Sequence, residues 1–492
     1  MIGNDLPALS IADLQMLLRR REVSPHELIN VLRERIEAID GDLGAYLSFD
    51  IEAAMTEAEH ANIDLPLGGI PIAVKDIINV MGQPCTCASK ILNSYRAPYD
   101  ATVIQKLRAA GAIPFGKTNL DEFAMGSSTE NSAVKSTRNP WDLSRVPGGS
   151  SGGSAAAVSA DEAFGALGSD TGGSIRQPAA LCGVVGLKPS YGRVSRFGLV
   201  AFASSLDQIG PVTKTVRDAA LVMNAIAGHD LQDSTSLDAP VPDYVASLGK
   251  DLRGMRLGLP KEYMIDGIDP QVRAAIDAAV KQLNSLGAEI VGVSLPSTEY
   301  AVAVYYIIAT AEASANLARF DGVRYGYRAE NPKDVLDLYG RTREEGFGPE
   351  VKRRIILGTY VLSSGYYDAY YLRAQKVREL IRHDFASVFE KVDALISPTS
   401  PVAAFKLGER AADPLQMYLA DIFTIAANLG GICGISVPCG FAELNGNRLP
   451  IGLQLLGKPL DEGRILQIAH AYEQSTDWHK ARPPIASTGP KL

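Results

Sequence analysis

Residues 146–178 read VPGGSSGGSAAAVSADEAFGALGSDTGGSIRQP and contain two clusters of glycine and serine, at 148–154 and 168–174. Between the clusters lie a run of small residues typical of a helix and a short apolar stretch typical of a buried strand. A Gly/Ser run is often a flexible linker. Here both clusters lie within apolar sequence, so we interpret them as loops in which the backbone approaches another group closely.

Loops of this kind bind either a phosphate or the oxyanion of a reacting carbonyl group. Neither cluster ends in the Gly-Lys-Ser/Thr of a phosphate loop, and Gly-x-Gly-x-x-Gly is absent. The remaining interpretation of the two clusters is an oxyanion site next to a nucleophilic serine. Serine needs a base, and no histidine lies between His60 and His229. A distant histidine could still fold into the site, and a lysine is the alternative base.

Lys75 is the candidate lysine. It follows the apolar run Ile70–Val74, which is typical of a buried strand. Burial disfavours the charged ammonium group, lowers the lysine pKa and so produces a neutral amine that can accept a proton. Two alternatives stand beside this one: Lys75 pairs with Asp76, or its amine extends into solvent.

The surrounding sequence alternates between helical and strand patterns, which predicts an α/β fold. We expect one large domain, with a mixed β-sheet covered by helices on both faces. Its parts are N-terminal helices (1–60), a catalytic core (61–230), a helical tyrosine-rich region (231–380) and the C-terminal part of the core (381–492). Helix N-caps are predicted at Ser10, Ser24, Asp100 and Asp269, and strands at 70–74, 112–115, 256–259 and 289–295.

The composition excludes several classes of protein. The chain has 492 residues, with 48 Lys and Arg against 56 Asp and Glu, a net charge of −8. This argues against a protein that binds nucleic acid through its own basic field. The five scattered cysteines favour a reducing compartment, and Cys85 and Cys87 are too closely spaced for a metal site. We therefore expect no metal.

Two segments bear on location. The first ten residues, MIGNDLPALS, lack the basic and apolar parts of a signal peptide. Residues 422–442 are uncharged and long enough to cross a membrane, but they contain glycine, proline and asparagine. We interpret them as a buried helix followed by a buried strand. The expectation is a cytoplasmic protein with no membrane association.

Several motifs together resemble the amidase signature family. The runs GGSSGGSAAAV and GSDTGGSIRQPA, with VAVKD upstream, are long, specific and in the family's order. The segments EFAMGSSTENS (122–132), KRRIILGTY (352–360), GYYDAYY (365–371) and DIFTIAANLGG (421–431) resemble the branch of the family that serves tRNA-dependent amidotransferases. The resemblance covers nearly the whole chain and is weakest at its two ends.

The resemblance implies a Ser–cis-Ser–Lys triad. Ser174 would be the nucleophile that forms the acyl-enzyme. Ser150 would be the bridging serine, on a cis peptide bond after Gly149, and Lys75 the base that acts through it. Ser151 is the rival for the bridging position.

The resemblance also implies the binding groups. The N–H groups of Thr171, Gly172, Gly173 and Ser174 would form the oxyanion hole. Arg354 would bind the α-carboxylate of glutamine and Asp421 its α-ammonium group, with Tyr305 a further pocket residue. The alternatives are an exposed ion pair for Arg354, with a one-residue ambiguity because Arg353 is adjacent, and a helix N-cap for Asp421.

The implied function is glutamine hydrolysis that supplies ammonia for converting Glu-tRNA(Gln), with Asp-tRNA(Asn) left open as a second substrate. The implied partners are a B subunit, which would bind most of the tRNA and use ATP and Mg, and a small C subunit. No cofactor is expected in this chain. The alternatives are a free-standing amidase acting on small-molecule amides and, in a different class, a non-catalytic scaffold.

Overall fold

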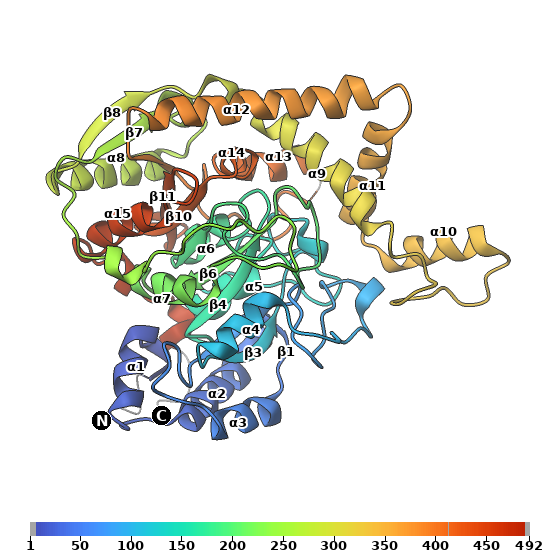
Figure 1. The fold of residues 1–492 in the computed structure, drawn as a ribbon, viewed down its shortest axis with the longest axis horizontal. Helices are drawn as coiled ribbons and strands as arrows, with labels where there is room; N and C mark the ends of the chain where they lie inside the picture. The colour runs from blue at the N-terminus through green and yellow to red at the C-terminus, as the bar shows by residue number, and fades with distance from the viewer. Residues whose placement is uncertain (1–5, 412, 488–492) are drawn as a thin grey trace.

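A mixed β-sheet of 11 strands runs through the molecule, whose computed structural model describes residues 6–411 and 413–487. The strand order is β1-β3-β2-β4-β6-β5-β10-β11-β9-β7-β8. Figure 1 shows β1 and β3 at one end of this order and β7 and β8 at the other, upper left. The strands are β1 (Tyr46–Ser48), β2 (Pro71–Lys75), β3 (Ile113–Thr118), β4 (Gly165–Asp170), β5 (Val185–Lys188), β6 (Gln208–Thr213), β7 (Arg256–Pro260), β8 (Glu289–Val293), β9 (Ala394–Pro398), β10 (Cys433–Leu444) and β11 (Asn447–Gly457). Strands β3, β2 and β4 are parallel, as are β9, β7 and β8, and the remaining neighbours are antiparallel. The predicted α/β fold with a mixed sheet is confirmed.

Helices cover both faces of this sheet. A Cβ atom built on Gly452 of β11 would meet Ala180 of α6, whereas one built on Gly457 would meet Ile465 of α15. The two glycines are five positions apart, an odd number, so their Cβ positions point to opposite faces of the strand. The covering helices include α5 (Gly152–Ser159), α6 (Arg176–Cys182), α7 (Val216–Ile226) and α15 (Glu462–Gln474).

Most of the predicted helix starts are confirmed. Ser10, Ser24 and Asp269 accept backbone N–H groups as N-caps. The cap predicted at Asp100 is wrong: Ala101 holds that position, and the Asp100 carboxylate instead accepts the N–H of Met81 and pairs with an arginine. The helices concerned are α1 (Ile11–Arg19), α2 (Pro25–Leu43), α4 (Thr102–Ala109) and α8 (Pro270–Ser285). Helix α3 (Ile51–Glu59), whose start was not predicted, lies between β1 and β2 in the chain.

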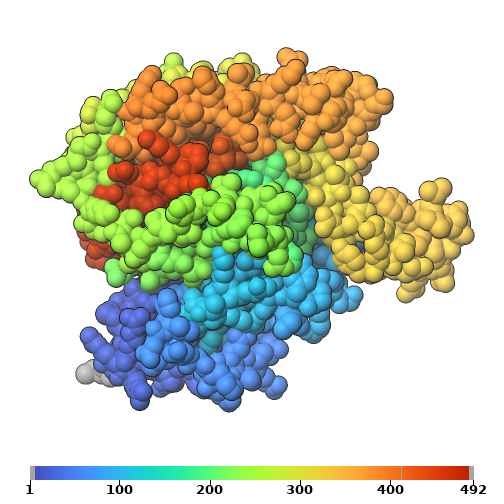
Figure 2. Space-filling model, viewed as in Figure 1, coloured from blue at the N-terminus to red at the C-terminus, as the bar shows by residue number. Residues whose placement is uncertain are grey.

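The tyrosine-rich stretch forms part of the sheet and a layer of helices over it. Strands β7 and β8 extend the sheet at one edge. Helices α11 and α12 both pack against α9, and a π-helix connects them. The segment around α10, yellow to orange in Figure 2, projects from the body of the molecule. These helices are α9 (Ala301–Leu317), α10 (Val335–Gly346), α11 (Pro349–Leu362), the π-helix (Tyr367–Leu372) and α12 (Arg373–Phe389).

The uncharged segment 422–442 lies inside the fold. It contains helix α14 (Ile425–Gly430), which follows α13 (Pro414–Tyr418), and the first part of β10. The predicted sequence of buried helix and buried strand is confirmed. Among residues 6–411 and 413–487, no helix combines the length and apolar character needed to cross a bilayer.

Candidate active site

Three neighbouring parallel strands have their carboxyl ends on the same side of the sheet. The candidate base Lys75 and the loops that carry the candidate serines lie there. β2 pairs in parallel with β3 on one side and with β4 on the other. Lys75 is the last residue of β2 and Asp170 the last of β4. Loops at the carboxyl ends of parallel strands commonly form binding sites. The two Gly/Ser clusters meet at these strand ends.

The amine of Lys75 lies among serine hydroxyls. Its Nζ is 2.7 Å from Ser150 Oγ, 2.8 Å from Ser151 Oγ and 3.0 Å from Ser169 Oγ. Lys75 is 0% exposed. The alternative in which its amine extends into solvent is therefore wrong.

Burial controls the protonation of Lys75. Removal from water lowers its pKa to about 7, although the carboxylates of Asp121 and Asp170 favour the charged form. At neutral pH a substantial fraction of Lys75 is thus an uncharged amine.

The other alternative for Lys75, an ion pair with Asp76, is also wrong, because Asp76 pairs with Lys117 at 3.5 Å.

The two candidate bridging serines differ in their other contacts. Ser151 Oγ donates to the carbonyl oxygen of Ser169 at 3.0 Å and accepts the N–H of Ser169 at 3.2 Å. Within the described part of the chain, Ser150 Oγ has no hydrogen-bond partner except Lys75. The peptide bond between Gly149 and Ser150 is cis. The hydroxyl proton of Ser150 is therefore free for transfer, whereas that of Ser151 is held by the backbone of β4.

Ser174 lies in the loop between β4 and α6. Its carbonyl oxygen accepts the N–H of Ser151 at 3.1 Å, which fixes the two Gly/Ser clusters to each other. Ser174 is 8% exposed, whereas Lys75, Ser150 and Ser151 are each 0% exposed. No hydrogen bond joins the hydroxyls of Ser174 and Ser150 in the described structure. Ser174 is thus the member of this group most open to solvent.

The turn before Ser174 presents backbone donors. The N–H of Gly173 donates to Asp170 Oδ1 at 2.8 Å, so it is not free to bind an oxyanion in this structure. Although burial opposes ionisation of Asp170, the adjacent Arg176 lowers its pKa to about 2 and keeps it an acceptor. The N–H groups of Thr171, Gly172 and Ser174 have no acceptor among residues 6–411 and 413–487.

Tyr305 of α9 packs against the same turn. A Cβ atom built on Gly172 would lie 2.7 Å from the Tyr305 ring, closer than any side chain permits. Tyr305 is 5% exposed. The helical layer over the sheet thus reaches the turn that precedes Ser174.

Arg354 of α11 is buried beside the site. Its Nε donates to Glu350 Oε1 at 2.7 Å and its Nη2 to the carbonyl oxygen of Gly126 at 2.8 Å. Arg354 is 2% exposed, whereas the side chain of Arg353 is 43% exposed. The guanidinium group lies within 5.5 Å of the ring centroids of Phe202, Tyr306 and Tyr418. The alternative of an exposed ion pair is wrong, and burial favours Arg354 over Arg353.

Asp421 lies beside the loop that carries Ser174. Its Oδ1 would be 3.3 Å from a Cβ atom built on Gly173. Ser127 donates its hydroxyl to Asp421 Oδ2, and Oδ1 is buried without a partner in the described part of the chain. Burial raises the pKa of Asp421 to about 7. The N-cap alternative is wrong, because Thr424 occupies the position before α14.

Sequence reasoning missed several residues of this arrangement, among them Ser169, Ser127 and Glu350. Ser169 lies in the second Gly/Ser cluster, directly before Asp170, and its place in that cluster was the signal that could have marked it as a site residue. Ser127 lies in the segment EFAMGSSTENS, whose resemblance to the family assigns it no role. Glu350 is four residues before Arg354 on the same helix, and this spacing places opposite charges side by side.

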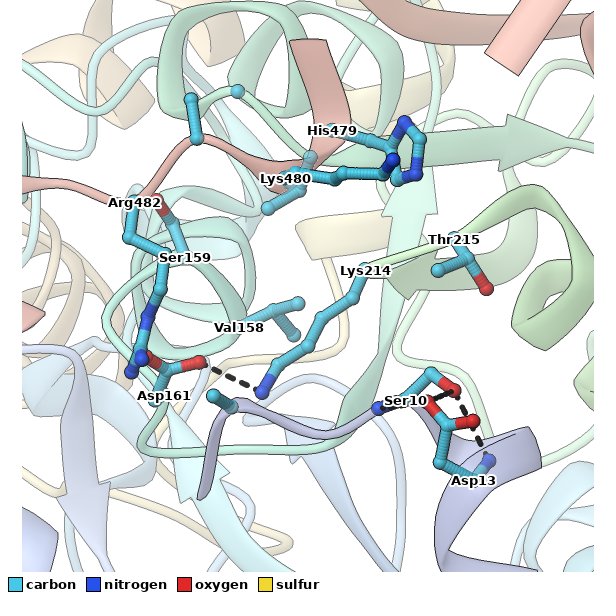
Figure 3. A pocket seen from close by; sticks show the side chains of 14 residues that line it. Ser10, Asp13, Val158, Ser159, Asp161, Lys214, Thr215, His479, Lys480 and Arg482 are labelled. Carbon is cyan, nitrogen blue, oxygen red and sulfur yellow. Dashed lines mark hydrogen bonds and ion pairs between the residues drawn. The ribbon is translucent and has the colours of Figure 1, made fainter. Parts of the chain in front are cut away.

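A pocket of about 270 Å³ lies apart from this site, where α1, the end of α5 and the segment after β6 meet (Figure 3). Lys214 pairs there with Asp161 at 2.7 Å, and Asp161 also pairs with Arg482. None of the candidate catalytic residues lines this pocket.

In the described part of the chain, no group of three or more His, Cys, Asp and Glu residues could hold a metal ion.

Comparison with known proteins identifies the class. The profile of the family described as Amidase matches residues 27–466. The chain belongs to the amidase signature family, and the resemblance seen in its motifs is confirmed.

Particular members of the family are similar over the whole chain. The A subunit of the glutamyl-tRNA(Gln) amidotransferase of Methylacidiphilum infernorum (isolate V4) is 61% identical over 478 residues, which cover 97% of this chain and 96% of that protein. The protein of the same name from Carboxydothermus hydrogenoformans is 58% identical and covers 98% of this chain and 100% of that protein. The crystal structure of the Thermotoga maritima A subunit has a TM-score of 0.80 at 45% identity, covering 96% of this chain and 95% of that one.

Proposed function

We propose that this chain is the glutamine-hydrolysing component of an amidotransferase that converts Glu-tRNA(Gln). The observation that carries the proposal is the buried Lys75 amine, 2.7 Å from Ser150 Oγ, with the buried charged side chains of Arg354 and Asp421 nearby. The relatives that share more than half of its residues are named as A subunits of a glutamyl-tRNA(Gln) amidotransferase, which supports Glu-tRNA(Gln) as the substrate of the whole enzyme.

The proposed mechanism starts with a proton relay. Neutral Lys75 accepts a proton from Ser150, and Ser150 accepts one from Ser174. The Ser150 hydroxyl suits this role because its proton is not held by the backbone. The relay requires the Ser174 hydroxyl to turn toward Ser150 when substrate binds, since catalytic hydrogen bonds often tighten only in the complex.

The alkoxide of Ser174 then attacks the side-chain amide carbon of glutamine. The new oxyanion is bound by the N–H groups of Thr171, Gly172 and Ser174, and one such donor typically contributes ~10²–10³ in rate. The relay returns its proton to the leaving nitrogen, the C–N bond breaks, and ammonia departs. Water, deprotonated by the same relay, then hydrolyses the ester to release glutamate and restore the Ser174 hydroxyl.

Two buried charges would select glutamine. Arg354 Nη1 makes no hydrogen bond within the described chain and can bind the α-carboxylate. The unpartnered Oδ1 of Asp421 can accept the α-ammonium group. Tyr305 would close the pocket over Gly172. Each substrate charge then meets an opposite charge in a site with little water.

The proposal includes partners. Ammonia must reach a second reaction, in which a B subunit would activate the tRNA-bound glutamate with ATP and Mg. A small C subunit would be the third member of the complex. The acidic charge of this chain, −8, agrees with tRNA being bound mainly by the partner. Free cysteines and the translation-related names of the relatives support a cytoplasmic location.

Ser174→Ala tests the proposal. We expect the variant to lose glutamine hydrolysis and acyl-enzyme formation while it keeps its fold, because only a nearly buried hydroxyl is removed. Ammonia release from glutamine and mass spectrometry of the trapped ester are the measurements. Normal hydrolysis by Ser174→Ala would contradict the nucleophile assignment. An unmodified chain that hydrolyses aryl or fatty amides but not glutamine would be a free-standing amidase.

A further inference from the structure

The carboxylate of Asp121 anchors a loop that runs past the active site. Asp121 follows β3 and is 0% exposed. Its Oδ2 accepts the N–H groups of Ser128 at 3.2 Å and Thr129 at 2.8 Å, and its Oδ1 accepts that of Asn131 at 3.1 Å. Hydrogen bonds to a buried ionised group are among the stronger ones in proteins. One side chain thus fixes the path of residues 126–131.

The anchored loop contacts both proposed glutamine-binding groups. Its first residue, Gly126, accepts a hydrogen bond from Arg354 through its carbonyl oxygen. The next residue, Ser127, donates its hydroxyl to Asp421. The positions of the guanidinium group and the carboxylate therefore both depend on the loop that Asp121 holds.

Asp121 also lies against the bridging serine. Its own N–H donates to the carbonyl oxygen of Ser150 at 3.3 Å. A Cβ atom on Gly149 would lie 2.2 Å from Asp121 Oδ2, and one on Gly126 would lie 2.6 Å from it. Glycine at both positions leaves the space that the carboxylate occupies. Asp121 is thus in contact with the catalytic segment on one side and the pocket loop on the other.

We propose that Asp121 is a positioning residue that fixes the glutamine pocket relative to the Lys75–Ser150 pair. It touches neither substrate nor the reacting atoms, and the assignment rests on the proposed function. Its role is to hold Gly126 and Ser127 where Arg354 and Asp421 need them.

The charge of Asp121 has a second effect. Four groups face Lys75 and favour its charged form: Asp121 after β3, Asp170 at the end of β4, Asp207 before β6 and Cys87 after β2, with Asp121 the largest. Burial raises the pKa of Asp121 itself to about 6, so it is mostly ionised at pH 7. Removing this charge makes protonation of Lys75 less favourable and lowers the lysine pKa further.

Asp121→Asn tests both effects at once, and Asp218→Asn is its control; each substitution is made in the full chain, purified with the subunits that accompany it. Asp218 is also buried and accepts a backbone N–H, that of Ala12 at 3.0 Å, but it contacts none of the proposed catalytic or pocket residues. We expect Asp121→Asn to raise the KM for glutamine about tenfold, the usual loss for one hydrogen bond to a buried charge. The acid limb of kcat should move to lower pH. Asp218→Asn should change neither.

Two outcomes would overturn the proposal: an unchanged KM and acid limb in folded Asp121→Asn, or the same kinetic changes in Asp218→Asn. Gly126→Ala provides an independent test if Asp121→Asn does not fold. It displaces the carboxylate and keeps its charge, so KM should rise while the acid limb stays in place; an unchanged KM would also refute the role. Failure of the unmodified chain to hydrolyse glutamine would instead refute the proposed function.

Discussion

The loops around Lys75 and the helices that cover them expose very different side chains. Lys75 and the serines that contact it are almost entirely removed from solvent. The segment from α11 to α12 shows the opposite pattern and carries exposed large apolar and aromatic residues: Ile356, Leu357, Tyr360, Tyr366, Tyr367, Tyr370, Leu372 and Leu380. The inner region excludes water from polar groups, whereas the outer layer leaves apolar groups in contact with it.

Under the proposed function, the reacting groups and two of the binding groups lie in different regions. Lys75, Ser150 and Ser174 all come from the strand ends and Gly/Ser loops of the inner region. Arg354 and Tyr305 come from α11 and α9, in the outer layer, and point inward from it. Changes in the inner region should therefore act mainly on kcat, and changes in the outer layer mainly on KM.

Lys75→Met should have the largest effect. It keeps an unbranched apolar stem but removes the amine that would accept the proton, and general-base catalysis typically contributes ~10²–10⁴-fold. We expect kcat for glutamine to fall by about 10³-fold or more with little change in KM. Steady-state ammonia release at several glutamine concentrations measures both.

Lys188→Met is the matched control for that variant. Lys188 is also buried, its pKa is lowered to about 8 chiefly by desolvation, and its amine donates to the carbonyl oxygen of Pro189 at 2.7 Å. It contacts no member of the proposed triad. A comparable fall in kcat for Lys188→Met would mean that loss of any buried lysine explains the effect.

Arg354→Lys should have a smaller effect on a different parameter. Lysine keeps the charge, but its single amine cannot retain the hydrogen bonds of Arg354 to Glu350 and Gly126 and also bind a carboxylate as the free Nη1 would. We expect KM for glutamine to rise by about 10- to 100-fold, since each lost bond of this type is worth roughly a factor of ten, while kcat changes little. Arg353→Lys, one residue earlier and partly exposed, should leave KM unchanged. Equal effects of the two substitutions would place the carboxylate site elsewhere.

Much of the inner region could be predicted from sequence because its signals are local. The apolar run before Lys75 required a buried strand, and burial alone gave the amine its lowered pKa. The caps at Ser10, Ser24 and Asp269 were equally local. At Asp100 the local signal failed, because a tertiary contact with the N–H of Met81 took the carboxylate away from the helix.

The rest of the site depended on contacts between distant segments. The family resemblance placed the bridging role at Ser150, but the contact that distinguishes its hydroxyl from that of Ser151, the hydrogen bond from Ser151 to the backbone of β4, could not be predicted. The link from Ser127 to Asp421 spans 294 residues and leaves no periodic pattern. Strand β1 escaped prediction because three residues are too few to show alternation, and its pairing with β3 holds it.

The pH dependence of the two kinetic parameters gives the smallest and most discriminating test. Lys75 and Asp421 both have a pKa of about 7, the first lowered and the second raised chiefly by desolvation. Lys75 must be neutral to accept a proton, so kcat should fall about tenfold between pH 8 and pH 6 as the amine becomes charged. Asp421 must be ionised to hold the ammonium group, so KM should rise over the same range.

Asp421→Asn distinguishes the two titrations. The Asp421 carboxylate accepts a hydrogen bond from Ser127 and lies near three charged side chains, those of Asp170, Arg354 and Arg176. With the carboxylate replaced by an amide, KM should be high and nearly independent of pH, while the acid limb of kcat remains near pH 7. Initial rates across this range, at saturating and limiting glutamine, measure both parameters. If the limb of kcat disappears together with that of KM, the titrating group is Asp421 alone, and the inner region does not control kcat through Lys75.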